Sequence, residues 1–204
     1  MQRYDRMTAL VIVDLQNDFA DPDGGLTVAV GDAIVGSVND EVAIAMDAGA
    51  TVVATQDWHP ESTPHFAKDG GVWPVHCVAD TWGAELHPRL VLPAETIVVR
   101  KGTNGEDGYS GFTMRDPVTG EEIPTVLDRL LRERGVRRVI VVGLATDYCV
   151  KATVLDGVRL GYETSLIVDA VAAVDLAAGD GDRALAEMRE AGVQLMRTSR
   201  EGST

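Results

Sequence analysis

Cysteine is scarce in this sequence, and long apolar runs are missing from it. Only Cys77 and Cys149 occur among 204 residues, too few for a disulfide framework, so a reducing, cytoplasmic location is expected. The chain opens with MQRYDRM, which lacks the apolar core of a signal peptide. No apolar run reaches the length of a membrane span, so we expect no membrane partner.

Positive charge is in short supply as well. The chain has 18 Lys and Arg residues against 32 Asp and Glu residues, a net charge of −14. This charge opposes binding to nucleic acid and to anionic membranes. The sequence also lacks a P-loop and the glycine-rich fingerprint of dinucleotide-binding folds, which disfavours nucleotide-cofactor chemistry.

What the sequence does contain is a regular alternation of short apolar runs and segments of helical periodicity. Strands are predicted at residues 8–14, 51–55, 96–99, 139–142, 163–168 and 193–196. Helices are predicted at residues 32–48, 125–134, 182–191 and just after Cys149. The alternation predicts an α/β fold with a doubly wound, mostly parallel six-stranded sheet and helices on both faces. Because no linker or repeat interrupts it, residues 1–204 are expected to form a single domain.

The stretch around Cys149 places a cysteine just after a buried strand. Its sequence, RRVIVVGLATDYCVKATVLDG, spans residues 137–157. Valines four residues apart predict a helix there, which Thr146 or Asp147 can cap. A thiol at a helix N-terminus has a lowered pKa and is a candidate nucleophile. The alternative is that Cys149 is a small, buried hydrophobic residue.

Two further polar residues, Asp14 and Lys101, end predicted strands. Because the carboxyl ends of parallel strands meet at one edge of a sheet, both could lie beside Cys149. Asp14 would then take the thiol proton, and Lys101 would hold the carboxylate, lower the thiol pKa and stabilise negative charge. The alternative is a buried Asp–Lys pair beside an inert thiol.

Three of the four histidines, His59, His65 and His76, follow the second predicted strand within eighteen positions, beside Asp57. Imidazole and carboxylate ligands suit Zn²⁺, Mn²⁺ or Fe²⁺. These four side chains would leave one or two positions for water or substrate. We therefore predict one divalent metal ion, with zinc preferred to iron and manganese, although a histidine in a loop can also be purely structural.

Aromatic residues make up only 5% of the chain, yet Phe19, Trp73 and Tyr109 all lie on loops that follow strand ends. Such rings could sandwich a flat aromatic substrate. Ordinary loop packing explains each of them equally well.

The motifs that carry these residues resemble one family. They are VDLQNDF, QDWHP, WPVHCV, KGTN, YSGF and GLATDYCVKATVLDG, and they extend from about Ala9 to Ala170. Together they resemble the nicotinamidases of the isochorismatase-like cysteine hydrolase superfamily. The resemblance implies the isochorismatase-like hydrolase fold. It also implies hydrolysis of nicotinamide to nicotinate and ammonia through a cysteine thioester, a step of NAD salvage.

The resemblance also implies roles for the residues at the strand ends. Cys149 would be the nucleophile, with Asp14 and Lys101 as the other members of a catalytic triad. A cis peptide bond is implied between Leu144 and Ala145. The N–H groups of Ala145 and Cys149 would then form the oxyanion hole.

For the metal ion, the resemblance implies four ligands: Asp57, His59, His65 and His76. It places Phe19 and Trp73 at the substrate ring, where we also expect Tyr109. The implied role of the ion is to bind the pyridine nitrogen and position the ring. A metal-activated hydroxide is the rival role.

Two other functional classes stay open at this point. A metal-free isochorismatase-like or N-carbamoyl amidohydrolase would share the triad but would not need the Asp/His cluster. A non-catalytic binding protein on the same fold would not need the triad. The sequence also leaves a homo-oligomeric state open.

Overall fold

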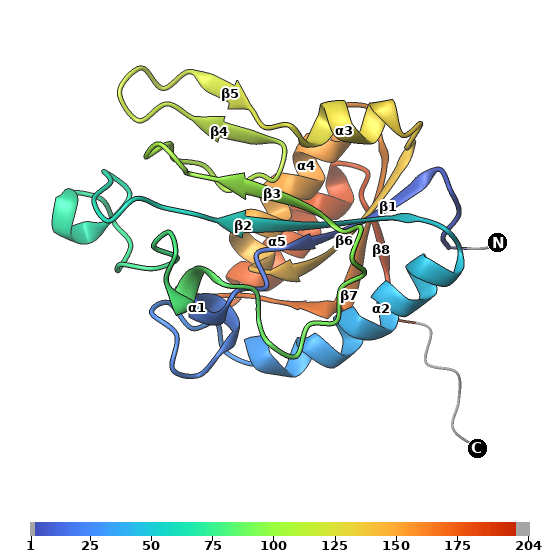
Figure 1. The fold of residues 1–204 in the computed structure, drawn as a ribbon, viewed down its shortest axis with the longest axis horizontal. Coiled ribbons are helices and arrows are strands. Elements are labelled where there is room, and N and C mark those ends of the chain that lie inside the picture. Colours follow the sequence, from blue (N-terminus) through green and yellow to red (C-terminus); the bar gives the residue numbers. More distant parts are fainter. Residues whose placement is uncertain (1–2, 199–204) are drawn as a thin grey trace.

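The computed structural model describes residues 3–198, and its centre is a six-stranded sheet (Figure 1). The strands are β1 (Thr8–Val13), β2 (Thr51–Asp57), β3 (Ile97–Lys101), β6 (Arg138–Leu144), β7 (Glu163–Ala172) and β8 (Gln194–Met196). They lie in the order β3-β2-β1-β6-β7-β8, and every neighbouring pair is parallel. The predicted doubly wound sheet is confirmed.

Helices cover both faces of the sheet (Figure 1). They are α1 (Asn17–Ala20), α2 (Val35–Asp47), α3 (Leu127–Glu133), α4 (Lys151–Arg159) and α5 (Asp180–Glu190). Strand β1 is buried along its whole length, as expected of a central parallel strand. Its Leu10 and Ile12 share a core with α2, whereas Ala9, Val11 and Val13 pack on the face covered by α3, α4 and α5.

The direction of winding reverses between β1 and β6. The chain runs from β1 through β2 to β3, then returns to place β6 on the other side of β1. The crevice outside the carboxyl ends at such a reversal is where open α/β sheets bind ligands. Here the two strands approach closely at Gly143, whose φ is +111°. A Cβ at Gly143 would lie 2.1 Å from the Val13 carbonyl oxygen, so only glycine fits.

The structure differs from the predicted elements in a few places. The segment predicted as one helix over 32–48 begins with a 3₁₀ turn, Gly31–Ile34, and β7 continues four residues past 168 to Ala172. The sequence analysis missed an antiparallel hairpin, β4 (Thr113–Arg115) and β5 (Glu122–Pro124). Each of its strands has three residues, none of them fully buried, so neither produces a periodic signal.

Between β2 and β3 the chain is irregular, as predicted, with only two 3₁₀ turns, Ala67–Asp69 and Trp82–Ala84. Phe66 is fully buried and Trp73 is 7% exposed, so this long connection packs against the rest of the molecule. Within residues 3–198, no helix has both the length and the apolar character required to cross a membrane.

Candidate active site

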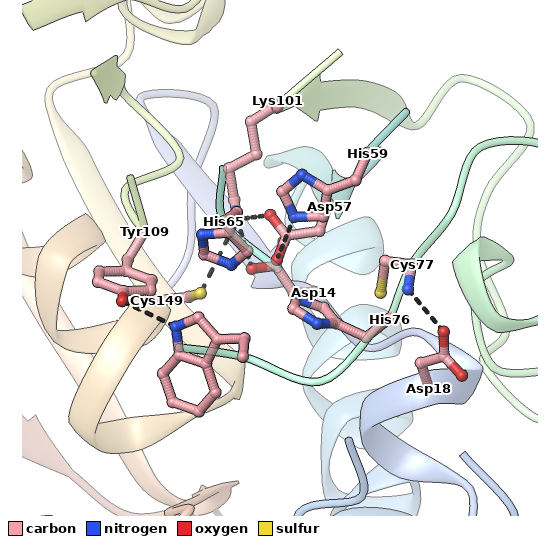
Figure 2. A network of polar contacts seen from close by, with 12 residues as sticks. Asp14, Asp18, Asp57, His59, His65, His76, Cys77, Lys101, Tyr109 and Cys149 are labelled. Atoms are coloured by element: carbon pink, nitrogen blue, oxygen red, sulfur yellow. Dashed lines mark hydrogen bonds and ion pairs between the residues drawn. The ribbon is translucent and has the colours of Figure 1, made fainter. Parts of the chain in front are cut away.

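The structure brings Asp14, Lys101 and Cys149 together at the carboxyl ends of β1, β3 and β6 (Figure 2). We call these three residues the strand-end cluster. Lys101 Nζ lies 2.9 Å from Asp14 Oδ2 and 3.8 Å from Cys149 Sγ. All three residues are buried, and Cys149, at 7%, is the most exposed. The cluster therefore holds an acid–base group and a nucleophile within reach of one ammonium.

Asp14 is oriented by Thr55, a buried residue of β2 that the sequence analysis did not single out. The Thr55 hydroxyl donates to Asp14 Oδ1 at 2.6 Å and accepts the Asp14 N–H at 3.1 Å. The second carboxylate oxygen, Oδ2, is thus the one that faces Lys101. Burial raises the pKa of Asp14, and the Lys101 ammonium offsets only part of that rise.

Cys149 lies in a single π-helical turn, Thr146–Val150, that leads into α4. The prediction that Thr146 or Asp147 caps this helix is wrong. No side chain caps the turn. The Asp147 carboxylate instead accepts the N–H groups of Val174 and Asp175, at 3.0 and 2.9 Å, and ties the turn to the chain after β7.

Lys101 lowers the pKa of Cys149, as expected, but the net shift is opposite to the predicted one. Burial raises the pKa of Cys149 well above its ordinary value, and Lys101 offsets this only in part. Burial lowers the pKa of Lys101, but the carboxylates of Asp14 and Asp57 outweigh it and hold that pKa high. The resting cluster therefore contains a thiol, a nearby base and a charged ammonium.

The turn before Cys149 contains a cis peptide bond between Leu144 and Ala145. The Ala145 carbonyl accepts the N–H groups of Tyr148 and Val150, at 3.1 and 3.0 Å. The Ala145 N–H donates to no backbone oxygen of residues 3–198. A buried donor of this kind is suited to bind a negatively charged oxygen.

His59, His65 and His76 form a second group, the histidine cluster, beside the first (Figure 2). One ring nitrogen of each histidine lies within 4.8 Å of those of the other two. The ring centroids are 4.8 to 5.4 Å apart, and the buried Phe66 ring packs 5.5 Å from both His59 and His76. Three imidazoles are therefore gathered around one point.

The ring nitrogens of this cluster have different partners. His65 Nδ1 lies 2.8 Å from Asp107 Oδ1, and His76 Nδ1 lies 2.7 Å from the Pro74 carbonyl oxygen. Because these acceptors hold the proton on Nδ1, Nε2 is the free nitrogen of both rings. His59 is buried, and neither of its nitrogens has a hydrogen-bond partner among the described residues. A metal ion at the cluster would satisfy such orphaned atoms.

Asp57 connects the two clusters. Its Oδ1 accepts a hydrogen bond from Lys101 Nζ, and its Oδ2 lies 3.9 Å from His59 Nε2. Burial raises the pKa of Asp57, but Lys101 and then His59 outweigh it and hold the pKa at about 2. Burial lowers the pKa of His59 to about 4, so that ring is neutral. A carboxylate with imidazole nitrogens is a donor set that fits Zn²⁺ or a similar divalent ion.

Two residues inside the recognised motifs hold this region in place, although the sequence analysis gave them no role. The Gln16 side chain donates to the Asp57 carbonyl at 2.7 Å and accepts the Asp57 N–H at 2.8 Å. Gly102 has a φ of +77°, and a Cβ there would lie 2.7 Å from the His59 ring. Only glycine fits at position 102, because any side chain there would collide with the His59 ring.

A pocket opens beside both clusters and encloses about 380 Å³, including its open mouth. Polar or reactive residues in its lining are Asp57, His65, His76 and Cys149, next to Ala145. The rest of the wall is aromatic or aliphatic: Phe19, Leu26, Val28, Trp73, Tyr109, Tyr148 and Val174. No lysine or arginine of the described residues is part of this lining. The pocket therefore suits a flat, uncharged molecule.

The three predicted ring-binding residues are all in the pocket wall, and a fourth aromatic residue joins them. Trp73 Nε1 donates to the Tyr109 hydroxyl at 3.1 Å. Tyr148, which the sequence analysis missed, packs edge-on to both, with centroid distances of 4.9 Å to Trp73 and 5.4 Å to Tyr109. Its position next to Cys149 in the sequence was the available signal.

A doubly wound sheet with a cysteine, an aspartate and a lysine at its reversal point is the architecture of an α/β cysteine hydrolase. The comparison with known families narrows this class. The chain belongs to the isochorismatase family, because the family model described as Isochorismatase domain matches residues 8–200.

Individual relatives cover nearly the whole chain. It is 40% identical to the nicotinamidase of Escherichia coli (strain K12) over 203 residues, 92% of this chain and 93% of that one. It is similar to the pyrazinamidase of Pyrococcus horikoshii in complex with zinc, with a TM-score of 0.84, 41% identity, and coverage of 94% and 99%. PnC1 from L. infantum in complex with nicotinate gives a TM-score of 0.85, 38% identity, and coverage of 95% and 94%.

Proposed function

We propose that this protein is a cytoplasmic nicotinamidase, a single catalytic domain that hydrolyses nicotinamide to nicotinate and ammonia. The observation that carries the proposal is the largely aromatic and aliphatic pocket, which has Cys149, His65 and His76 in its wall. The identity of 40% to the E. coli nicotinamidase across most of both chains supports it. The histidine cluster disfavours the metal-free amidohydrolases, and the strand-end cluster disfavours a purely binding protein.

In the first half of the reaction, Cys149 attacks the amide carbon while Asp14 takes its proton. Because burial keeps the thiol protonated at rest, deprotonation has to accompany the attack, and the raised pKa of Asp14 makes it a better acceptor. The Lys101 ammonium, 3.8 Å from the sulfur, stabilises the developing negative charge. The N–H groups of Ala145 and Cys149 receive the oxyanion.

The second half restores the enzyme. Protonated Asp14 gives its proton to the leaving nitrogen, the C–N bond breaks, and ammonia departs from a thioester on Cys149. Asp14 then takes a proton from water as the water oxygen attacks the thioester carbon. The C–S bond breaks, the sulfur recovers the proton, and nicotinate is released.

We propose that a divalent ion, with zinc as the first candidate, is held by four ligands: Asp57, His59, His65 and His76. The zinc in the P. horikoshii pyrazinamidase structure supports a divalent ion. When bound, the ion supplies a Lewis acid that binds the pyridine nitrogen and so orients the ring. Phe19, Trp73 and Tyr109 would hold the faces and edge of that ring.

The test is ammonia release from nicotinamide and from benzamide, each with and without a chelator. Benzamide has the same amide and nearly the same shape but no ring nitrogen. Loss of orientation costs orders of magnitude in rate, so we expect benzamide to be a very poor substrate and chelation to slow nicotinamide far more. Absence of turnover of nicotinamide by the metal-loaded protein would refute the function. Equal losses for the two amides would instead favour a hydroxide-generating ion.

A further inference from the structure

The contact between His65 and Asp107 has no part in the reaction steps proposed above. In the histidine cluster, His76 Nδ1 is bound to the backbone carbonyl of Pro74, and neither nitrogen of His59 has a partner among the described residues. His65 alone has a carboxylate at Nδ1, at 2.8 Å. It is therefore the one ring of the three whose partner is a side chain and can be removed by substitution.

The backbone around Asp107 fixes where that carboxylate lies. The Asp107 N–H donates to the Arg115 carbonyl at 2.8 Å, and the Arg115 N–H donates back to the Asp107 carbonyl at 2.6 Å. Arg115 is the last residue of β4, which pairs with β5. The backbone hydrogen bonds of the hairpin thus continue to Asp107, and they hold the backbone of Asp107 in place.

The carboxylate itself is also held in place. Asp107 Oδ1 accepts the Gly108 N–H at 2.8 Å as well as facing His65. The His65 side chain is 6% exposed and the Asp107 side chain 46%. One end of this contact is therefore buried in the histidine cluster, and the other is half-exposed, in the chain that precedes β4.

We propose that Asp107 is a positioning residue for the metal site, acting through His65. It holds the His65 proton on Nδ1, fixes the plane of the ring, and leaves Nε2 as the ligand atom. A carboxylate behind a metal-binding imidazole also makes the ring a stronger donor. The inference rests on the proposed metal-dependent function and adds to it a residue and a purpose for the β4–β5 hairpin.

The direct test is zinc affinity, measured by competition with a chromophoric chelator on the full-length protein. Loss of such a partner typically weakens metal binding by 10- to 100-fold. Because Asp107 is half-exposed, we expect Asp107→Ala to weaken zinc binding by about tenfold, the low end of that range. Asp107→Asn keeps an acceptor oxygen and should recover most of the affinity.

Asp116 provides a matched control on the same hairpin. Its carboxylate also accepts backbone N–H groups, those of Val118 and Thr119, both at 2.8 Å. Asp116→Ala should therefore disturb the hairpin locally and leave zinc affinity unchanged. Equal weakening in Asp116→Ala and Asp107→Ala would overturn the proposal, because the effect would then belong to the hairpin as a whole.

A double substitution separates positioning from a general structural role. If Asp107 acts only through His65, the variant His65→Ala/Asp107→Ala should bind zinc no more weakly than His65→Ala alone. A further loss of about tenfold in the double variant would overturn the proposal. Without metal, the melting temperature of Asp107→Asn should match that of the wild type. Zinc should raise the melting temperature of this variant nearly as much as it raises that of the wild type.

The outcomes also distinguish this inference from the proposed function. If His65→Ala leaves zinc affinity unchanged, the proposed metal site itself is wrong. If His65→Ala weakens zinc binding and Asp107→Ala does not, only the role of Asp107 is wrong.

Discussion

The strand-end cluster and the histidine cluster are neighbours that are built in opposite ways. The first takes its residues from the ends of three parallel strands, whose register places them together. The second takes its residues from the irregular connection between β2 and β3. The first pairs its own charges, Lys101 with Asp14. The second leaves His59 buried and unpartnered within residues 3–198.

The strand ends and the turn after β6 therefore complete one half of the site by themselves, whereas the other half needs an ion to complete it. Substitutions in the strand-end cluster should therefore change chemistry or stability without changing metal content. Changes in the histidine cluster should lower metal content and, through the loss of the ion, the turnover of nicotinamide.

The largest expected effect is on turnover in Cys149→Ala. Removal of a nucleophile costs roughly 10⁴-fold or more in kcat, and the thiol is not among the four proposed ligands. We therefore expect ammonia release to vanish while zinc content, measured by elemental analysis, stays that of the wild type. Residual activity near the wild-type level would remove Cys149 from its proposed role, and loss of zinc would show that the clusters are not separable.

The second largest effect is expected on the free energy of unfolding of the variant Lys101→Met. This substitution takes the ammonium away from two buried carboxylates, Asp14 and Asp57. Breaking a buried pair from one side costs about 3–5 kcal/mol, and urea denaturation should measure a loss of that size. Adding Asp14→Asn should restore part of it, because one unpaired charge is then gone. A loss of unfolding free energy below about 1 kcal/mol, which is typical of solvated surface pairs, would contradict the prediction.

A smaller effect is expected on the acid stability of the metal-free protein. The pKa of His59 is about 4 in the folded chain, against 6.5 ordinarily. Between these values the unfolded chain binds the proton and the folded chain does not, so stability falls as the pH is lowered from 6.5 to 4. The shift corresponds to roughly 3 kcal/mol. Urea titrations at a series of pH values should show this slope, and His59→Asn should reduce it; an unchanged slope would exclude His59 as its source.

The smallest effect concerns the two cysteines. Burial raises the pKa of both Cys77 and Cys149, so acidity does not distinguish them. Access does, because Cys149 lines the pocket and Cys77 is fully buried. We expect iodoacetamide to modify Cys149 before Cys77, by about tenfold in rate if access follows thiol exposure. Mass spectrometry that finds Cys77 labelled first would contradict this.

The sequence was enough to predict the sheet and the residues at its strand ends. Buried parallel strands have a recognisable composition, and the rule that ligands bind at their carboxyl ends is general. Asp14 and Cys149 could therefore be placed together before any coordinates. The histidines could be grouped because they are close in sequence, as His59 and His65 show.

Contacts between segments that are far apart in the sequence could not be predicted. Asp147 was a plausible helix cap, yet its carboxylate binds Val174 and Asp175, 27 and 28 residues away. Thr55 contacts Asp14 across 41 residues, and no local pattern indicates this. The net shift in the pKa of Cys149 was predicted in the wrong direction because burial, which is set by the whole fold, outweighs the effect of Lys101.

The double pairing of Asp57 has a consequence for redesign of this scaffold. One of its oxygens binds Lys101 and the other faces His59. Replacing all three histidines would therefore leave Asp14 and Asp57 both paired with Lys101. The histidines can thus be varied in redesign while both carboxylates at the strand ends keep their ammonium partner.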